Sequence, residues 1–557
     1  MISLERSNPA GRRRLAMRVL GAAGAVAFLV GLIVGSVTPT GPERVTHDFA
    51  RAWSRGDYSR MYSLLTPGAK KRASEVAFRS AYSTAANTAT AADMRITRVH
   101  GTQVTVQFDT RIFGTVRGVV RLRVADDHVD WSPNLVFPGL GPGATLTRRT
   151  QAPRRAAILS RNGRTIVSGP GTSRVVSPSS PASSIVGTVA PPTSAADQTR
   201  MYARGFPPGT PVGTSGLERA LDPFVMGRPG GELIAGGRRI AAAAPRRAHA
   251  VRSSIDLRIQ AAAVQAVGGR FGGIAALDPG TGRIRALAGI AFSAPQPPGS
   301  TFKMITTTAA LEAKKVKTSS TFPVETHAVI EGVNLSNANG ESCGGTFAEA
   351  FAESCNSVFA PLGVKVGAKR LVAMAERFGF NEPSSVVGAA PSTLPSAAEV
   401  GSPLAVGSTA IGQGKVLATP LEMAVVADTI GSHGIRHRPT LLEHGGTSHG
   451  IRVTSKHIAR TVEKLMVGVV QHGTGTAAAI PGVVVAGKTG TAELGSTVGP
   501  TGAQTSGDTD AWFAAFAPTR KPRIVAAALF VKAGAGGQTA APAVRPVLIA
   551  GLSANKR

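Results

Sequence analysis

The sequence predicts a multidomain α+β protein with a single transmembrane helix, a small cone-shaped domain, an extended β-rich region and a large domain whose antiparallel sheet is flanked by helices. Three observations predict this class. The chain has 557 residues, too many for one compact core. An uncharged apolar stretch occupies residues 19–37. After it, apolar residues recur first with a helical period and then with the alternating period of strands.

The predicted membrane segment comes first in the chain. Residues 19–37, VLGAAGAVAFLVGLIVGSV, would reach about 28 Å as a helix, close to the thickness of a bilayer's hydrocarbon core. The stretch exceeds the apolar region of a signal peptide and no A-x-A site follows, which favours an uncleaved anchor over a cleaved leader. Because residues 1–18 carry an arginine cluster, we expect a cytoplasmic N-terminal tail and a single-pass protein of the cell membrane, extracytoplasmic after the span.

The charge balance excludes one class of partner. Lys and Arg total 62 against 32 Asp and Glu, a net charge of +30, most of it within the first 250 residues. No zinc-ligand spacing, recognition-helix pattern or aromatic RNA-binding signature accompanies it, so we expect no nucleic-acid partner. A basic surface facing anionic lipid or acidic envelope polymers fits the charge better.

Residues 43–147 are predicted to form the cone domain. Apolar residues in PERVTHDFARAWSRGDYSRMYSLL recur near helical spacing. The segments ITRVHGTQVTVQFDTRIF and VRGVVRLRVADDHVDW then alternate apolar and polar residues, as half-buried strands do. No catalytic cluster is visible there, so we interpret the domain as a spacer or interaction module.

Residues 151–249 have the Pro, Gly, Ser and Thr content of a flexible linker. Three segments nevertheless keep apolar spacing: AILSRNGRTIV, SSIVGTVA and GTSGLERALDPFVMGRPG. We expect them to form short strands in an extended subdomain, with a linker as the alternative.

The remaining residues, 250–557, are predicted to form the large domain. RSSIDLRIQAAAVQAV has the pattern of a capped amphipathic helix. GGIAALDPGTGRIRALAGI predicts two strands joined by a Pro-Gly-Thr-Gly turn.

The strongest candidate for chemistry is Ser300 with Lys303. Pro297, Pro298 and Gly299 interrupt regular structure just before them, so both should lie on one face of a helix's first turn. A serine hydroxyl becomes a good nucleophile when a base accepts its proton, and a lysine can be that base if burial or nearby cations lower its pKa. The helix N-terminus can stabilise developing negative charge. The alternative is a helix cap beside an exposed lysine.

A second motif is Ser354-Cys355-Asn356. Thr346 and Glu349 have the spacing of a capping box, so a short helix should end near Ser354 and leave a hydroxyl and an amide projecting from a loop.

A third motif, Lys488-Thr489-Gly490-Thr491, follows a β-branched strand. Lys488 supplies positive charge, Gly490 lets a ligand backbone approach, and the Thr489 and Thr491 hydroxyls can hold a carboxylate. Such a strand at a sheet edge can also pair with an extended peptide.

These three motifs, in this order, are the combination of penicillin-binding proteins and class A β-lactamases. From Val251 onward the chain resembles a class B penicillin-binding protein, a membrane-anchored peptidoglycan D,D-transpeptidase. The resemblance extends to DPGTGRIRALA, IGQGKVLATPLEMA, GTGTAAAIPGVVVAGKTGTAE and DAWFAAFAP. The acidic glycosyltransferase motifs of class A members are not apparent. Upstream, AWSRGDYSRMYSLL and WSPNLVFPGL are similar to the NTF2-like, MecA-N-type domain of some members, and residues 151–249 more loosely to their dimerisation or pedestal region.

The resemblance implies a β-lactamase-like transpeptidase domain at residues 250–557, with assigned catalytic roles. Ser300 would attack the penultimate D-Ala carbonyl of a stem peptide, with Lys303 accepting its proton. Ser354 would relay a proton to the leaving amine, Asn356 would position Lys303 and the substrate amide, and Lys488 would polarise the network.

The same resemblance implies the binding roles. Thr489 and Thr491 would bind the substrate carboxylate beside Gly490, and the backbone N–H groups of Ser300 and Thr491 would form the oxyanion hole.

Cys355 occupies the position that is Asp in the common Ser-Asp-Asn motif. Cys343 and Cys355 are the only cysteines, and the expected compartment permits a disulfide. A helix between them would separate their Cα atoms beyond disulfide range unless the Gly344-Gly345 pair folds the chain back. Both a bonded and a free pair therefore stay open.

The implied partners are D-Ala-D-Ala stem peptides, β-lactams, the membrane, a glycan-polymerising membrane protein and other proteins of elongation or division, with no cofactor. No metal site is expected, because His433, His437 and His449 lack metal-ligand spacing. The alternatives are a β-lactamase or D,D-carboxypeptidase of the same fold, or a non-catalytic envelope scaffold or β-lactam sensor.

Overall fold

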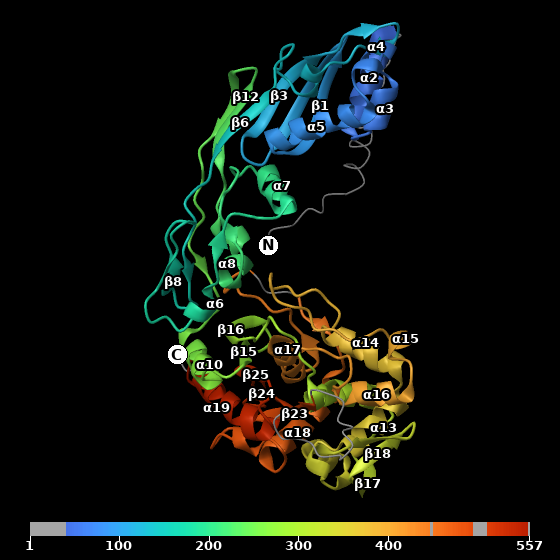
Figure 1. Ribbon diagram of the computed structural model, residues 1–557, viewed down its shortest axis with the longest axis vertical. Helices are drawn as coiled ribbons and strands as arrows, with labels where there is room; N and C mark the ends of the chain where they lie inside the picture. The colour runs from blue at the N-terminus through green and yellow to red at the C-terminus, as the bar shows by residue number, and fades with distance from the viewer. Residues whose placement is uncertain (1–40, 446–448, 494–508, 555–557) are drawn as a thin grey trace, which may run out of the picture. The chain divides into compact units, whose positions relative to one another are not determined.

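The computed structural model describes residues 41–445, 449–493 and 509–554, which form two compact units (Figure 1). The first unit contains the described residues up to Ala152 together with 195–208 and 229–245, and the second contains the rest. Within the described ranges, no helix combines the length and apolar character needed to cross a membrane. The predicted span at residues 19–37 lies outside them.

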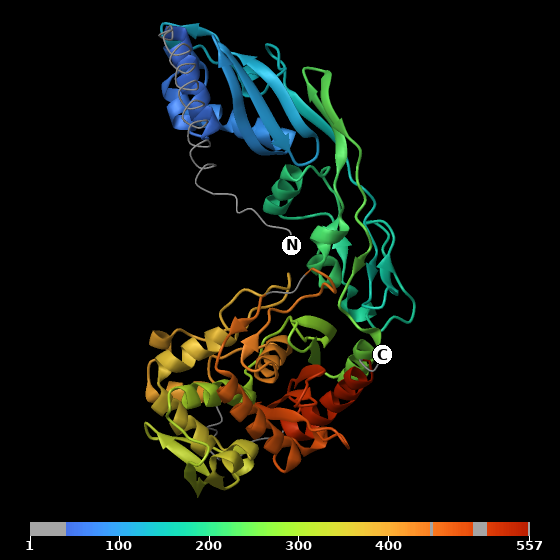
Figure 2. The ribbon, with the colours of Figure 1, turned by 180° about the vertical axis from the view of Figure 1, so that it is seen from behind.

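The first unit packs helices on an antiparallel sheet, which confirms the predicted change of period (Figure 2). Its helices are α2 (Gly41–Ser54), α3 (Tyr58–Ser63), α4 (Pro67–Arg72) and α5 (Glu75–Ala89). The sheet has the order β1 (Ala91–His100), β2 (Gln103–Thr110), β3 (Gly114–Arg121). Four aromatic rings pack together in the core, those of Trp53, Phe78, Tyr82 and Trp131. The centroids of contacting rings are 4.9 to 6.4 Å apart.

Shorter elements complete this unit. They are β4 (Val124–Ala125), β5 (His128–Val129), the 3-10 helix η1 (Pro133–Val136), α7 (Ala195–Ala203), and a sheet of order β13 (Arg238–Ala243), β12 (Gly230–Ala235), β6 (Leu146–Gln151).

The second unit begins with short elements. A four-stranded sheet has the order β14 (Val251–Arg252), β7 (Ile158–Leu159), β8 (Thr165–Ser168), β9 (Val175–Val176). Around it lie β10 (Val189–Ala190), β11 (Val212–Gly213), α6 (Ser183–Val186), α8 (Gly216–Ala220) and α9 (Asp222–Val225).

The expectation of strands in this region is only partly right. AILSRNGRTIV forms β7 and β8 and the end of SSIVGTVA forms β10, but SSIV forms α6 and GLERALDPFV forms α8 and α9. Leu217, Leu221 and Val225 are buried at four-residue spacing, which is a helical face, and Pro223 lies in the first turn of α9, where proline favours helix. Short apolar runs do not distinguish the two structures by periodicity alone.

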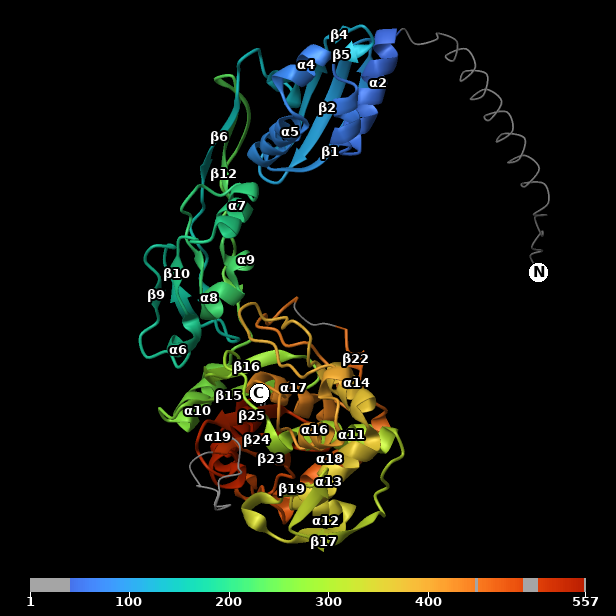
Figure 3. The same cartoon turned by 45° about the vertical axis from the view of Figure 1, so that its right-hand side comes forward.

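A five-stranded antiparallel sheet forms the centre of the second unit (Figure 3). Its order is β16 (Arg283–Gly289), β15 (Gly272–Asp278), β25 (Ile524–Phe530), β24 (Thr509–Ala517), β23 (Ala486–Glu493). The predicted turn joins β15 to β16. Helices α10 (Leu257–Val267) and α19 (Gly536–Ala554) cover one face, and α17 (Pro420–Gly431) and α18 (Lys456–Gln471) cover the other. Because both faces are covered, every residue of β25 is buried.

The rest of this unit is largely helical and carries two of the three motifs. Its helices are η2 (Gly299–Phe302), α11 (Lys303–Glu312), η3 (Ala338–Gly340), α12 (Phe347–Ala352), α13 (Asn356–Val366), α14 (Ala368–Phe378), α15 (Ala397–Val400), α16 (Pro403–Ala410) and η4 (Thr476–Ala478). Its short strands pair as β17 (Thr321–Glu325) with β20 (Cys343–Thr346), β18 (His327–Ile330) with β19 (Val333–Ser336), and β21 (Ile435–Arg436) with β22 (Ile451–Arg452).

Candidate active site

Ser300 lies in η2, the single 3-10 turn that leads directly into α11. Gly299 before it has φ +51°, and a β-carbon added there would lie 2.8 Å from the carbonyl oxygen of Thr491. A side chain at position 299 is therefore excluded by both backbone conformation and space. The glycine brings the Ser300 turn against β23, the strand that carries the third motif.

Lys303 begins α11 one turn after Ser300 and is fully buried. Its Nζ donates hydrogen bonds of 2.7 Å to the Ser354 carbonyl oxygen and 2.7 Å to Asn356 Oδ1, and lies 3.4 Å from Ser354 Oγ. The ammonium position is also 5.3 Å from the centroid of the Phe359 ring. The first two motifs therefore meet at one nitrogen atom.

The capping box predicted at Thr346 and Glu349 is present and starts α12. Ser354 follows that helix with φ +66°, a conformation that non-glycine residues adopt rarely and that recurs at functional sites. Cys355 then caps α13, and Asn356 is its first residue. This sharp reversal between two helices turns the Ser354 hydroxyl and the Asn356 amide toward Lys303.

Lys488 lies on the edge strand β23 and is also fully buried. Its Nζ donates to Ser354 Oγ at 2.8 Å and to the carbonyl oxygen of Thr489 at 3.1 Å. The Ser354 hydroxyl thus lies between the side-chain nitrogens of Lys303 and Lys488. Three segments far apart in the sequence are joined in one network, whereas the Ser300 hydroxyl forms no hydrogen bond within the described residues.

The other residues of the third motif lie beside this network. Thr489 Oγ1 is 2.6 Å from Thr474 Oγ1, and Thr491 Oγ1 accepts a hydrogen bond from the Gly536 N–H. A β-carbon added to Gly490 would lie 2.8 Å from the Pro298 carbonyl oxygen, so the glycine here allows the close approach of protein backbone. Each threonine hydroxyl has a partner within the protein.

Burial dominates the electrostatics of the two lysines. Burial, and after it the charge of Lys488, lower the pKa of Lys303 well below its ordinary value. Burial likewise lowers the pKa of Lys488 to about 7, with the Glu353 carboxylate opposing the shift. A neutral Lys303 beside a cationic Lys488 is the pairing that general-base activation of a serine requires.

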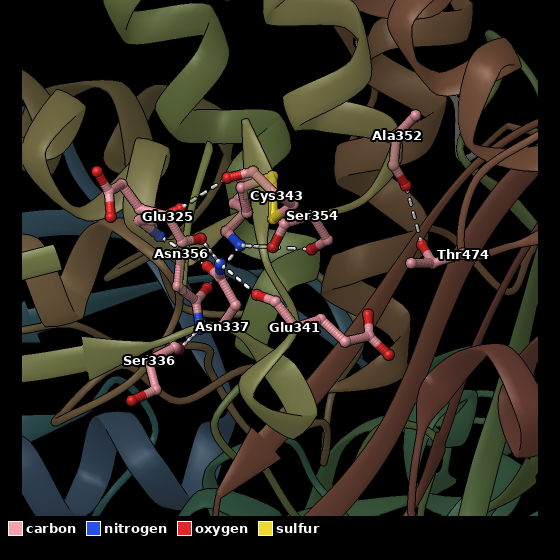
Figure 4. The surroundings of a disulfide bond; sticks show 12 residues. Glu325, Ser336, Asn337, Glu341, Cys343, Ala352, Ser354, Asn356 and Thr474 are labelled. Atoms are coloured by element: carbon pink, nitrogen blue, oxygen red, sulfur yellow. Dashed lines mark hydrogen bonds between the residues drawn. A yellow bond between two sulfur atoms is a disulfide. The ribbon is translucent and has the colours of Figure 1, made fainter. Parts of the chain in front are cut away.

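Cys343 and Cys355 are joined by a disulfide bond (Figure 4). The pairing of β20 with β17 and the glycines at 344 and 345 return the chain toward the start of α13, so that the two Cα atoms are 5.7 Å apart. Between the cysteines, α12 has only six residues. The sequence left open whether the two cysteines are bonded, and the structure shows that they are. The bond closes a loop of the chain that ends within the second motif.

We expect the double variant C343S/C355S to lose about 3 kcal/mol of unfolding free energy, because the bond spans 12 positions and limits the unfolded chain. Chemical denaturation of the oxidised wild type and the variant measures this difference. Wild type treated with reductant is the control and should match the variant. Equal stability of all three samples would contradict a stabilising bond.

Two polar residues next to the site lack a motif in the sequence. Asn337 is buried, with 2% of its surface exposed, and its side chain bonds three backbone groups around the second motif. Thr474 bonds Thr489 and also the Ala352 carbonyl oxygen at 3.2 Å, so it ties the second motif to the third. Only the position of Thr474 within GTGTAAAIPGVVVAGKTGTAE signalled it, because that segment carries the resemblance.

Known proteins contain both domains. Residues 272–548 match the penicillin binding protein transpeptidase domain, and residues 41–144 match the NTF2-like N-terminal transpeptidase domain. Peptidoglycan D,D-transpeptidase PbpA of Mycobacterium tuberculosis is 34% identical over 407 residues, 61% of this chain and 80% of that protein. PbpA of Mycolicibacterium smegmatis is 33% identical over 428 residues, 65% of this chain and 83% of that protein.

Solved structures agree with these relatives. Penicillin-binding protein A of M. tuberculosis, as its ceftriaxone acyl-enzyme complex, superposes with a TM-score of 0.57 at 28% identity, covering 72% of this chain and 98% of the other. A D,D-transpeptidase domain from Eggerthella lenta gives 0.58 at 29% identity, covering 72% and 99%. With its two matching domains and relatives matched over most of their length, this chain belongs to the class B penicillin-binding proteins, a family of peptidoglycan D,D-transpeptidases.

Proposed function

We propose that this protein is a peptidoglycan D,D-transpeptidase that cross-links stem peptides through an acyl-enzyme on Ser300. The observation that carries the proposal is the convergence of Lys303 and Lys488 on the Ser354 hydroxyl, next to the turn that holds Ser300. One buried base, one buried cation and a hydroxyl that can pass a proton between them suit acyl transfer by a serine.

In the acylation step, Ser300 Oγ forms a bond to the carbonyl carbon of the penultimate D-Ala while Lys303 accepts the hydroxyl proton. The backbone N–H groups of Ser300 and Thr491 stabilise the resulting oxyanion, and the close approach of Gly299 to Thr491 supports this pairing. Collapse breaks the amide bond to the terminal D-Ala, whose nitrogen takes the proton relayed by Ser354. The terminal D-Ala then leaves.

In the second step, the amine of a neighbouring stem peptide attacks the ester and forms the cross-link, and Ser300 recovers a proton. Lys488, with Thr489 and Thr491, attracts the carboxylate of the donor peptide, and β23 as an edge strand can pair with its backbone. A β-lactam enters by the same attack, which breaks its ring amide and leaves a stable ester. The M. tuberculosis relative has been solved as such an acyl-enzyme.

Residues 19–37 would anchor the protein, with residues 1–18 in the cytoplasm and the transpeptidase domain outside the cell membrane. A substrate attached to growing glycan at that surface implies a partner that polymerises glycan in the membrane, and a role in elongation or division. The NTF2-like domain would place the site at a distance from the bilayer or contact that partner.

We expect the rate constant for acylation by a penicillin to follow a bell-shaped pH profile. Its rising limb reports the loss of the Lys303 proton, because only the neutral amine accepts a proton from Ser300. Its falling limb, near the Lys488 pKa of about 7 in the free protein, reports the loss of the charge that attracts the β-lactam carboxylate. Stopped-flow acylation over the pH range in which the protein stays folded measures both limbs.

The control for that profile is Lys488→Arg, which keeps its charge at every pH in the range. The falling limb should move to higher pH in this variant while the rising limb stays in place. A profile without a rising limb would contradict the assignment of Lys303 as the base.

Transpeptidation is tested with the full-length protein in detergent, a glycan polymer bearing pentapeptide stems, and analysis of the products by mass spectrometry. We expect cross-linked dimers with release of D-Ala. Release of D-Ala without dimers would favour a carboxypeptidase, and repeated turnover of penicillin would favour a β-lactamase. A Ser300→Ala variant that still supports growth of a depletion strain would favour a scaffold.

A further inference from the structure

Asn337 joins three segments around the second motif (Figure 4). Its Nδ2 donates to the carbonyl oxygens of Glu325 at 2.7 Å and Glu341 at 2.8 Å, and its Oδ1 accepts from the Ser357 N–H at 2.8 Å. Its own backbone N–H donates to the Thr326 carbonyl oxygen at 2.8 Å. All the polar groups of this buried side chain are therefore satisfied by backbone atoms, which fixes the segment between β19 and β20.

The residue before it contacts the catalytic amide directly. The carbonyl oxygen of Ser336 accepts a hydrogen bond of 2.7 Å from Asn356 Nδ2 (Figure 4). With its NH2 group held there, the amide of Asn356 must present Oδ1 to Lys303 Nζ, also at 2.7 Å. The backbone at Ser336 thus decides which end of the Asn356 amide faces the proposed base.

We propose that Asn337 is a positioning residue of the transpeptidase, which fixes the Ser336 carbonyl and the first turn of α13 so that Asn356 offers an acceptor to Lys303. The proposal rests on the function proposed above. Asn337 holds the amide from both sides: it bonds Ser357, directly after Asn356, and it adjoins Ser336, which binds Asn356.

Loss of the Asn337 side chain leaves one N–H and two carbonyl oxygens of the backbone without their partners. The segment shifts to recover hydrogen bonds, and the Asn356 amide becomes free to rotate. In the rotated state its NH2 group faces Lys303 and donates to the lone pair of the neutral amine, which is the lone pair that must accept the Ser300 proton. A displacement of about 1 Å in a catalytic group can reduce a rate about 100-fold.

The test compares Asn337→Ala with Gln260→Ala. Gln260 is also a buried carboxamide, with bonds of 2.6 Å and 2.9 Å to the Leu287 backbone, but it lies in α10 against β16, the edge of the sheet opposite β23. Both variants lose hydrogen bonds from a buried carboxamide to backbone groups. We expect Asn337→Ala to lower the rate constant for acylation by a fluorescent penicillin at least about 10-fold, and Gln260→Ala to leave it within about 2-fold.

A second readout separates positioning from stability. The charged groups that act on Lys303 are Lys488 from β23 and, through Lys488, Glu353. Loss of the Asn356 acceptor disfavours the ammonium form of Lys303, so the rising limb of the pH profile should move to lower pH in Asn337→Ala. A variant that is only less stable would keep that limb in place.

Asn337→Ser, which retains one polar group, is used in the same way if the alanine variant does not fold. If Asn337→Ala is acylated as fast as Gln260→Ala, or if the rising limb of its pH profile does not move, Asn337 is not a positioning residue. If wild type itself is not acylated, the failure lies in the proposed function and not in this assignment.

Discussion

Ser300→Ala is expected to abolish acylation and cross-linking, with a loss of at least about 10⁴-fold in the acylation rate constant. The variant lacks the hydroxyl that is proposed to form the covalent intermediate, and losses of about 10⁶ are known when a serine nucleophile is deleted. Gel fluorescence with a labelled penicillin measures the rate, and the dimer assay measures cross-linking.

The matched control for this variant is Ser402→Ala. Ser402 also stands at a helix start, where its hydroxyl accepts from the Ala405 N–H at 3.2 Å. The substitution should cost about 1 kcal/mol of stability and leave acylation unchanged. Acylation of Ser300→Ala at the rate of this control would place the nucleophile elsewhere.

Lys303→Met is expected to reduce acylation about 10³-fold or more while the protein stays folded. Methionine is unbranched like lysine and one atom shorter, but it cannot act as a base, and general-base catalysis contributes about 10² to 10⁴ in rate. The substitution also removes an amine that is buried opposite Lys488, which offsets the cost of leaving Asn356 Oδ1 without its donor. The melting temperature should therefore change by less than about 5 °C.

Parallel measurement of the melting temperature and the acylation rate tests this separation. The pH profile adds a further check, because the residual acylation of Lys303→Met should lack the rising limb. If acylation falls only in proportion to a loss of folded protein, Lys303 is a structural residue and not the base.

The family resemblance carried by the three motifs implied which residues gather at the site. Ser300 and Lys303 are placed by local structure, since one helical turn separates them. Ser354 was predictable from the capping box, which fixes where α12 starts. The strand that bears Lys488 was predicted slightly too early: the β-branched run at residues 483–485 precedes it, and β23 begins at Ala486 and contains the motif itself. Local patterns also predicted the strands of the first unit, from their alternating apolar and polar residues, and the turn between β15 and β16.

Features that depend on contacts between distant segments were not predictable. The pKa of Lys303 is set by burial and by Lys488, which is far away in the sequence. Asn337 has no motif, because its partners are backbone groups that any sequence supplies. The bond between Cys343 and Cys355 depends on the pairing of β20 with β17, and the short helices α6, α8 and α9 depend on packing that short apolar runs do not encode.

Peptide mapping of the protein after incubation with penicillin tests the central claim most directly. Intact-mass measurement should first show a single adduct with the mass of one penicillin. Digestion should then locate that adduct on the peptide containing Ser300, and the Ser300→Ala protein should carry none. An adduct on any other serine, or an unmodified wild-type protein with its fold intact, would contradict the account of three distant motifs forming one acylating site.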